Sequence, residues 1–241
     1  MTTQIILVPG FWLGAWAWDD VVPLLRDQGY DVTALTLPGL AEGDSPGEVT
    51  LEDHVAAIGA TFDRAAGRRV LIVHSGAAIP GTVVLDRHHD LVDHVVFVDT
   101  APVRDGYAMN PDLEGDTFPL SEAWDEEMEG GSMRGLSEEQ LAAFRERAVP
   151  EPAGALRDVA HLTDVARLQV PATVVCTAYS SADYQSYAEQ GMPFLAGLLD
   201  HKALEYVDLP TGHWPMWSEP VKLAEIIANV AGRVERPLPT P

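Results

Sequence analysis

Two side chains at the ends of apolar runs have the chemistry needed for acyl transfer. Ser75 lies in LIVHSGAAIPG (71–81), where a β-branched run gives way to small residues, and His213 lies in DLPTGHWPMWSEP (208–220). A serine hydroxyl is a weak nucleophile at neutral pH, and an imidazole with a pKa near ~6.5 can take its proton and return it to a leaving group. The pair predicts nucleophilic catalysis, with Ser75 as nucleophile and His213 as general base.

The turn around Ser75 matches the G-x-S-x-G signature only in part. In that signature, small flanking residues allow a sharp bend that holds the serine hydroxyl clear of the backbone. Val73 and Ala77 occupy the two glycine positions here. Alanine is a mild change, whereas a branched side chain at position 73 is able to crowd the hydroxyl. The alternative is that Ser75 is only a small residue at an ordinary strand-to-helix turn.

The carboxylate that would orient His213 has two candidates. Asp99 ends the apolar run in VVFVDTAP (95–102), and Asp183 follows the run ATVVCTA at 172–178. However, Ser180 with Asp183 also matches the S-x-x-D start of a helix, in which the carboxylate only caps backbone N–H groups. We favour Asp99 and keep Asp183 as the alternative acid; a third interpretation is that neither serves.

The elements that must position these residues alternate along the chain. Continuous apolar runs are expected where helices cover both faces of a parallel sheet, and the segments between the runs have apolar residues at helical spacing. The runs lie at 4–10, 31–39, 68–76, 93–101, 172–178 and 203–212, and the helical segments at 19–29, 51–67, 76–90 and 221–235. This pattern predicts an α/β fold with a doubly wound, mostly parallel sheet, in a single domain over residues 1–241.

The segment from about 101 to 169 interrupts the alternation and has no strand signal. A helix is predicted to begin at the capping box of Ser137 and Gln140. Helices inserted at the carboxyl edge of a parallel sheet are well placed to form a lid over a cleft. Six large apolar residues of this segment are candidates for lining a pocket: Tyr107, Met109, Phe118, Trp124, Met128 and Met133. The proline-bearing tail at 235–241 is the one segment that we expect to be disordered.

Composition limits the classes of partner. With 37 acidic and 15 basic residues the formal net charge is −22, which disfavours nucleic acid and anionic membrane surfaces. The single cysteine, Cys176, has no partner for an intrachain disulfide and is expected to be a buried thiol. No secretion signal and no membrane-spanning run is recognisable, so we expect a cytoplasmic protein. No metal-ligand spacing occurs, and we expect neither metal nor organic cofactor.

The order of elements and three motifs resemble the α/β-hydrolase superfamily over nearly the whole chain. The chain is most similar to the small plant methylesterase and hydroxynitrile lyase branch and its bacterial esterase relatives. The first motif, VPGFWLGAWAWDDVVPLL (8–25), resembles that branch's H-G-x-x-x-G-A-W-x-W pattern, with Pro9 in place of the usual histidine. The resemblance implies an oxyanion hole formed by the backbone N–H groups of Phe11 and Gly76. It also implies that His74 is structural.

The function implied is serine hydrolysis of a carboxylic ester or lactone through an acyl-enzyme, with a small, apolar or aromatic substrate. Trp12, Trp124 and Trp214 are the expected pocket residues. A cyanohydrin lyase is disfavoured, because that branch has a lysine beside the histidine and this chain has Trp214. A non-catalytic ligand-binding protein is the alternative from another class, supported by Val73 at the turn and by the displaced acid. The sequence gives no indication of oligomeric state.

Overall fold

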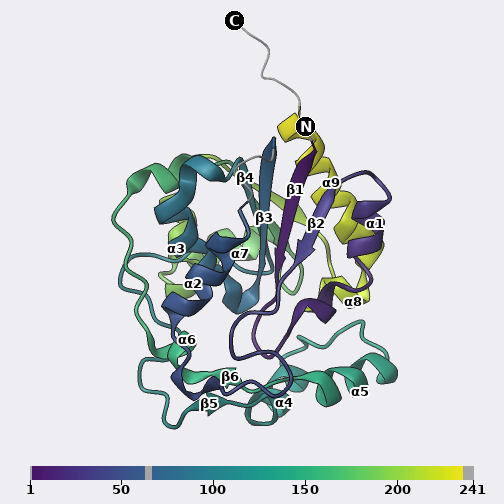
Figure 1. Cartoon of the computed structure of the whole chain (residues 1–241), viewed down its shortest axis with the longest axis vertical. Coiled ribbons are helices and arrows are strands. Elements are labelled where there is room, and N and C mark those ends of the chain that lie inside the picture. Colours follow the sequence, from purple (N-terminus) through teal and green to yellow (C-terminus); the bar gives the residue numbers. More distant parts are fainter. Residues whose placement is uncertain (1, 63–66, 236–241) are drawn as a thin grey trace, which may run out of the picture.

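The computed structural model describes residues 2–62 and 67–235 and is built around one parallel sheet (Figure 1). The six predicted strands are confirmed. They are β1 (Thr3–Val8), β2 (Asp31–Ala34), β3 (Arg68–His74), β4 (His94–Val98), β7 (Ala172–Cys176) and β8 (Leu204–Asp208). All pairings are parallel, in the order β2-β1-β3-β4-β7-β8. The carboxyl ends of β3, β4, β7 and β8, after which the candidate residues follow, therefore lie side by side at one edge.

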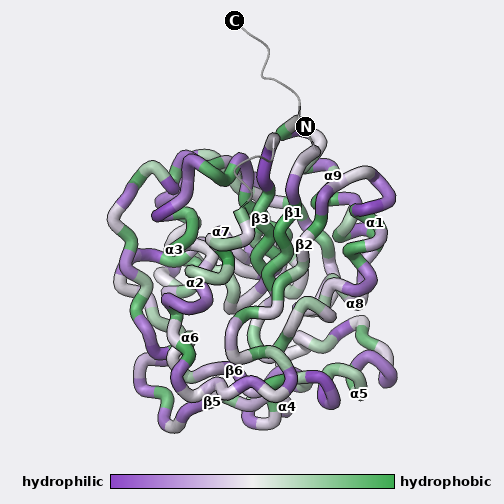
Figure 2. The backbone as a smooth tube through the Cα atoms, viewed as in Figure 1, coloured by the Kyte–Doolittle hydropathy of each residue, from purple (hydrophilic) through white to green (hydrophobic). Residues whose placement is uncertain are grey.

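Both faces of the sheet are buried because successive side chains of a strand point to opposite sides. In β1, Ile5 and Leu7 belong to one apolar core, and Ile6 and Val8 to the other. The helices α1 (Val22–Arg26) and α9 (Pro220–Glu235) contribute to the first core, and α2 (Leu51–Ala60), α3 (Ala78–His88) and α7 (Ser181–Glu189) to the second. Apolar residues accordingly concentrate along the strands and polar residues on the outer helices and loops (Figure 2).

The segment expected to form a lid lies across the carboxyl end of the sheet, at the bottom of Figure 1, and is called the lid below. It contains α4 (Leu120–Glu129), α5 (Glu138–Arg147) and α6 (Ala153–Arg157). The capping box of Ser137 and Gln140 is confirmed at the start of α5. The expectation of no strand in this segment was wrong: β5 (Thr117–Phe118) pairs antiparallel with β6 (Glu151–Pro152). Two residues per strand are too few to produce an alternating pattern, so the sequence offers no signal for this pair.

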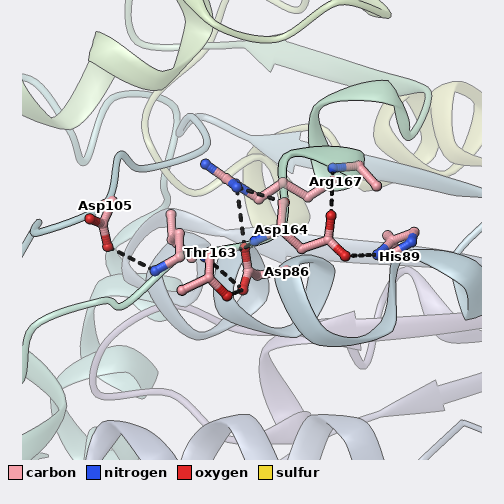
Figure 3. A network of polar contacts seen from close by, with 8 residues as sticks. Asp86, His89, Asp105, Thr163, Asp164 and Arg167 are labelled. Atoms are coloured by element: carbon pink, nitrogen blue, oxygen red, sulfur yellow. Dashed lines mark hydrogen bonds and ion pairs between the residues drawn. The ribbon is translucent and has the colours of Figure 1, made fainter.

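The end of the lid is fastened to α3 by a polar network (Figure 3). The buried Asp86 carboxylate accepts hydrogen bonds from the backbone N–H groups of Thr163 (2.9 Å) and Asp164 (2.8 Å) and pairs with Arg167 at 3.2 Å. Asp105 accepts a further bond from the N–H of Leu162 at 2.8 Å. Because a buried carboxylate is stable only with such partners, this network fixes the point at which the chain returns from the lid toward β7.

Several predicted helices are shorter than expected. The segment 19–29 gives only α1, and 51–67 gives α2, with residues 63–66 outside the described residues, as are 236–241 of the proline-bearing tail. The remaining elements are α8 (Pro215–Ser218) and the 3-10 helices η1 (Ala15–Trp18), η2 (Pro46–Glu48), η3 (Ser75–Ala77), η4 (His89–Leu91), η5 (Val165–Gln169) and η6 (Pro193–Leu199). Cys176 is buried and unpaired, as predicted. Within 2–62 and 67–235, no helix has the length and apolar character to cross a membrane.

Candidate active site

Three residues at the carboxyl end of the sheet have left-handed backbone conformations that are unusual for residues other than glycine. They are Trp12 (φ 67°), Ser75 (φ 52°) and Asp99 (φ 46°), and all three line the same cavity. Each such conformation costs about 1–3 kcal/mol and persists only when surrounding contacts impose it. Strained residues cluster at functional sites, so this coincidence marks the cavity as the candidate active site.

Ser75 lies directly after β3, at the first residue of η3, and α3 continues from there. Val73 does not crowd the Ser75 hydroxyl, because its side chain is fully buried in the core beneath α3. Gly81 of α3 leaves the space for it: a Cβ built at Gly81 would lie 2.6 Å from Val73 Cγ1. The close approach of strand and helix that a glycine before the nucleophile would allow is here provided by a glycine on the helix.

Ser75, His213 and Asp99 form a continuous hydrogen-bonded chain. His213 Nε2 lies 2.7 Å from Ser75 Oγ, and His213 Nδ1 lies 2.6 Å from Asp99 Oδ2. Since the aspartate accepts from Nδ1–H, Nε2 is left with its lone pair toward the serine hydroxyl. This is the tautomer in which an imidazole takes a proton from serine.

Asp99 is held as an anion by donors from the loop after β7. Its Oδ1 accepts hydrogen bonds from the backbone N–H groups of Thr177 (2.9 Å) and Ala178 (3.1 Å) and from the hydroxyl of Tyr184 (2.9 Å). Burial alone would raise the pKa of Asp99, but the bond to His213, its charge and the two N–H groups hold that pKa well below its usual range. The carboxylate therefore stays ionised while it orients the imidazole.

The surroundings of His213 make it a stronger base than a free imidazole. Burial disfavours its charged form, but the hydrogen bond and charge of Asp99 outweigh burial and raise the pKa of His213 above its ordinary value of 6.5, with a further contribution from Glu127. The backbone of His213 is fixed on both sides. Its N–H donates to the carbonyl of Ser132 at 2.7 Å, and its own carbonyl lies 2.8 Å from His74 Nε2.

His74 has the structural position expected of it. Its ring is fully buried, and burial, together with the nearby His213, lowers its pKa to about 3, so the imidazole is neutral. With Nε2–H donating to the His213 carbonyl, the ring supports the loop that carries the general base. Its Nδ1 has no hydrogen-bond partner among the described residues.

Asp183, the alternative acid, bonds to Ser180, and among the described contacts the carboxylate bonded to His213 is that of Asp99. Its carboxylate accepts bonds from the Ser180 backbone N–H (3.1 Å) and hydroxyl (2.6 Å), while the Ser180 hydroxyl accepts from the Asp183 N–H. This reciprocal pair is a capping box at the start of α7. The Asp183 carboxylate thus caps the N-terminus of α7, the helix from which Tyr184 contacts Asp99.

The two residues predicted to form the oxyanion hole are in direct contact. A Cβ built at Gly76 would lie only 2.2 Å from Cε1 of the Phe11 ring, so glycine at this position leaves room for the ring where it lies. Neither the Phe11 nor the Gly76 N–H donates a hydrogen bond to an acceptor within the described residues. Two unpaired donors beside a serine hydroxyl at a helix N-terminus are suited to accept negative charge.

The cavity that contains Ser75 has a volume of about 440 Å³. Its wall is largely apolar, and the lining side chains include Phe11, Ile79, Val103, Tyr107, Met109 and Phe118. Glu126 and Glu127 of α4 lie at one side, and no lysine or arginine of residues 2–62 and 67–235 lines the cavity. The site therefore offers an apolar wall, with acidic residues at one side and no cationic side chain.

The expected pocket residues are only partly in this cavity. Trp12 and Trp214 line it, as do Tyr107, Met109 and Phe118. The prediction for Trp124 was wrong: its ring lies against Phe144 and beneath the Arg145 guanidinium, 3.9 Å from its centre, and lines a separate groove. Met133 is buried in the core and Met128 is exposed, so neither reaches the cavity.

Two residues at the site were missed from the sequence. Tyr184 contacts Asp99, and Glu151 of β6 accepts a hydrogen bond from the Trp12 backbone N–H at 2.9 Å. Tyr184 follows the Ser180 capping box by one turn, which suggests a helix but no contact across the sheet. The one sequence feature of Glu151 is its place between two prolines in a short extended segment, which does not by itself predict a contact with Trp12.

A parallel sheet that presents a serine at a strained strand-to-helix turn, with a histidine and an aspartate after other strands at the same edge, has the architecture of an α/β hydrolase. The sequence model of the alpha/beta hydrolase family matches residues 5–226, and the chain belongs to this family.

Solved structures of similar fold cover nearly all of the chain. A pyrethroid hydrolase from Sphingobium faniae is 21% identical, covering 96% of this chain and 98% of its own, with a TM-score of 0.69. A methylesterase from Arabidopsis is 17% identical (97% and 100% covered, TM-score 0.72). Tomato methylketone synthase I, as a complexed H243A variant, is 15% identical (98% and 100%, TM-score 0.75). No curated protein matches the sequence. At these identities the likeness concerns the fold.

Proposed function

We propose that the protein is a serine hydrolase that cleaves carboxylic esters or lactones through an acyl-enzyme. The observation that carries the proposal is the hydrogen-bonded chain from Ser75 through His213 to Asp99, with distances of 2.7 and 2.6 Å, at the wall of a 440 Å³ cavity. Structural relatives include proteins named as a pyrethroid hydrolase and a methylesterase, and both names denote ester cleavage.

The reaction follows from the roles that the geometry allows. His213 Nε2 takes the Ser75 proton as Oγ attacks the carbonyl carbon, and the N–H groups of Phe11 and Gly76 stabilise the oxyanion. His213 then passes the proton to the leaving alcohol, which departs and leaves Ser75 acylated. In the second half His213 deprotonates water, which attacks the acyl carbonyl and releases the acid with the proton returned to Ser75.

The cavity wall favours a small, apolar or aromatic substrate. A volume of 440 Å³ and a wall with several aromatic and aliphatic side chains suit an uncharged acyl or alcohol group. With Glu126 and Glu127 at one side and no lysine or arginine among the described lining residues, an anionic substrate would be repelled. The absence of a lining lysine or arginine also gives a leaving cyanide no cationic partner, so the lyase alternative has no support from the described residues.

The test uses a fluorophosphonate probe, which requires no knowledge of the natural substrate. Intact mass should show one adduct on the wild type and none on Ser75→Ala, because the probe reacts with a serine activated by a base and an oxyanion hole. Ser132→Ala is the matched control, since Ser132 lines the same cavity, and it should label like the wild type. p-Nitrophenyl acetate, butyrate and benzoate then test turnover.

Absence of an adduct on the wild type would contradict the proposal and leave the non-catalytic binding protein ahead. In that case a ligand should raise the melting temperature without forming product. An adduct that persists on Ser75→Ala would place the nucleophile elsewhere and would equally contradict the proposed mechanism.

A further inference from the structure

Trp12 adopts a left-handed conformation immediately after Phe11, the residue whose N–H is the proposed oxyanion donor. Its φ is 67°, and its side chain is buried. A bulky residue takes up this conformation only when neighbouring contacts impose it. The turn at Trp12 sets the path of the loop after β1, so whatever holds Trp12 also holds the Phe11 N–H.

All three polar groups of Trp12 are bonded to the lid. Its indole N–H donates to the carbonyl of Phe118 in β5 at 2.9 Å, and its own carbonyl accepts the N–H of Val149 at 3.0 Å. Its backbone N–H donates to Glu151 Oε2 in β6 at 2.9 Å. Glu151 is the only one of these three partners that bonds through its side chain, so this contact can be altered by a substitution without changing the backbone.

The backbone that carries Glu151 is tightly seated. Gly154, three residues on, forms a bridge with Thr50 and lies so close to Val49 that a Cβ would be 2.2 Å from the Val49 carbonyl oxygen. The N–H of Ala153 donates to the carbonyl of Asp116 at 3.0 Å, which extends the β5–β6 pairing. Glu151 therefore presents its carboxyl group from a fixed position.

The Glu151 carboxyl is buried, and the described part of the chain offers it no cationic partner. Only 2% of the residue is exposed, and burial raises its pKa to about 8 despite the hydrogen bond from Trp12. His54 is the one other titratable side chain described around the small adjoining cavity. Burial lowers the pKa of His54, and its Nε2 lies 2.9 Å from the Pro38 carbonyl, so it is neutral as well. Glu151 is thus an uncharged carboxylic acid at neutral pH.

The geometry points to Glu151 as a positioning residue for the oxyanion loop, through which the lid holds the Phe11 N–H in place beside Ser75. Glu151 itself does not line the cavity that contains Ser75, so it acts on the reaction only through Trp12. This inference rests on the proposed function. It means that the lid, besides covering the cavity, is needed to complete the oxyanion hole.

The experiment compares Glu151→Gln and Glu151→Leu, with Glu146→Leu as the matched control. Glu146 is an exposed lid carboxylate on α5 with no hydrogen bond among the described contacts. Steady-state hydrolysis of p-nitrophenyl butyrate gives kcat and KM. The amide oxygen of glutamine still accepts from Trp12, so kcat should stay within about threefold of wild type. Leucine cannot accept, and kcat should fall about 10- to 100-fold with KM nearly unchanged.

The pH profile separates positioning from a merely structural role. The N–H of Trp12 is the one hydrogen-bond donor described for the Glu151 carboxylate, so as Glu151 ionises above about pH 8 we expect the loop to rearrange around the buried charge. The wild type should therefore lose kcat above that pH, and Glu151→Gln, which does not titrate, should keep it. Amide hydrogen exchange of a peptide covering residues 9–14 provides a readout that needs no activity: exchange should be faster in Glu151→Leu and unchanged in Glu151→Gln.

Equal kcat in the Leu and Gln variants, or a rise in KM alone, would overturn the inference. An equal loss of kcat at alkaline pH in the wild type and in Glu151→Gln would also overturn it. This comparison tests the inference even if Glu151→Leu fails to fold. If the wild type hydrolyses no ester and takes no fluorophosphonate, the proposed function fails, and the exchange measurement still decides the positioning. Unchanged exchange in Glu151→Leu would then overturn it, and faster exchange would support it.

Discussion

The turns after β4 and β7 each present an aspartate at the same edge of the sheet, and they use it in opposite ways. Asp99 after β4 is 6% exposed, has a left-handed backbone and bonds to His213. Asp183 after β7 is partly exposed and caps its own helix together with Ser180. A carboxylate whose bonds are local stabilises a helix end, whereas one whose bonds all come from other elements is available to orient a side chain across the site.

The two turns are also physically connected. Thr177 and Ala178, which begin the turn after β7, donate their N–H groups to Asp99, and Tyr184 from the helix that Asp183 caps donates its hydroxyl. The turn after β7 therefore supplies hydrogen-bond donors to Asp99, which follows β4, and does not supply the catalytic carboxylate itself. An aspartate after β4 can therefore orient His213, because donors from the turn after β7 hold its carboxylate in place.

The largest expected effect comes from removing the charge of Asp99, with the charge of Asp183 as the comparison. Asp99→Asn should lower kcat about 10⁴-fold, because an amide no longer favours the imidazole tautomer with a free Nε2 and no longer stabilises the imidazolium. Asp183→Asn should leave kcat within about twofold, since its contacts are confined to the capping box. Steady-state hydrolysis of one p-nitrophenyl ester measures both.

Circular dichroism of both variants serves as the control for folding. A severe loss of kcat in Asp183→Asn with an intact fold, or full activity in Asp99→Asn, would reverse the assignment of the acid.

Removing the Tyr184 hydroxyl should have the next largest effect. Tyr184→Phe takes away one of the four hydrogen bonds to Asp99, and bonds to charged groups contribute about 1.5–3 kcal/mol each. We expect kcat to fall about 10-fold with little change in KM, together with a loss of about 1–2 kcal/mol in the free energy of unfolding measured in urea.

Tyr187→Phe is the matched control on the same helix. Its ring packs against Tyr179, and its hydroxyl makes no hydrogen bond in the described part of the chain. Identical kcat values for the two tyrosine variants would show that the hydroxyl of Tyr184 does not hold Asp99.

A smaller effect is expected from the lid, through the pKa of His213. Because Asp99 and, more weakly, Glu127 raise this pKa, kcat/KM should fall as the pH drops through a value above 6.5, where Nε2 becomes protonated. Glu127→Gln removes one of the charges that raise this pKa, so the fall should move to lower pH, and by less in high salt.

Glu126→Gln is the control for this pH profile. Glu126 lines the same cavity, yet its charge is not among the causes that raise the pKa of His213. Equal displacement of the profile in both variants would indicate a general effect of lid charge and not a specific one of Glu127.

The sequence predicts well what depends on neighbouring residues. The six strands follow from continuous apolar runs, and the helix starts at Ser137 and Ser180 follow from residues three positions apart. The proximity of Ser75 and His213 follows from strand ends that share one edge of a parallel sheet. Each of these features is set by local pattern or by the topology that such patterns imply.

The sequence leaves open what depends on distances between elements. Both Asp99 and Asp183 follow strands at the correct edge, and the choice between them depends on how far each turn reaches. From the sequence alone Val73 is expected to crowd the turn at Ser75, and only the structure shows that Gly81 lies opposite to it and leaves the space it needs. Glu151 and Tyr184 contact residues 139 and 85 positions away, and the residues around them carry no pattern that relates to those contacts.

The smallest effect on activity is expected from a change in the capping box of Ser180 and Asp183 at the start of α7. Ser180→Ala removes the acceptor for the Asp183 N–H, and loss of such a cap costs about 1 kcal/mol of unfolding free energy. The Thr177 and Ala178 N–H groups lie before the helix and remain in place, so kcat should stay within about twofold. Urea unfolding and ester hydrolysis on the same sample measure both. A loss of kcat as large as that of Tyr184→Phe would mean that the start of α7, and not the Tyr184 hydroxyl alone, keeps Asp99 in position.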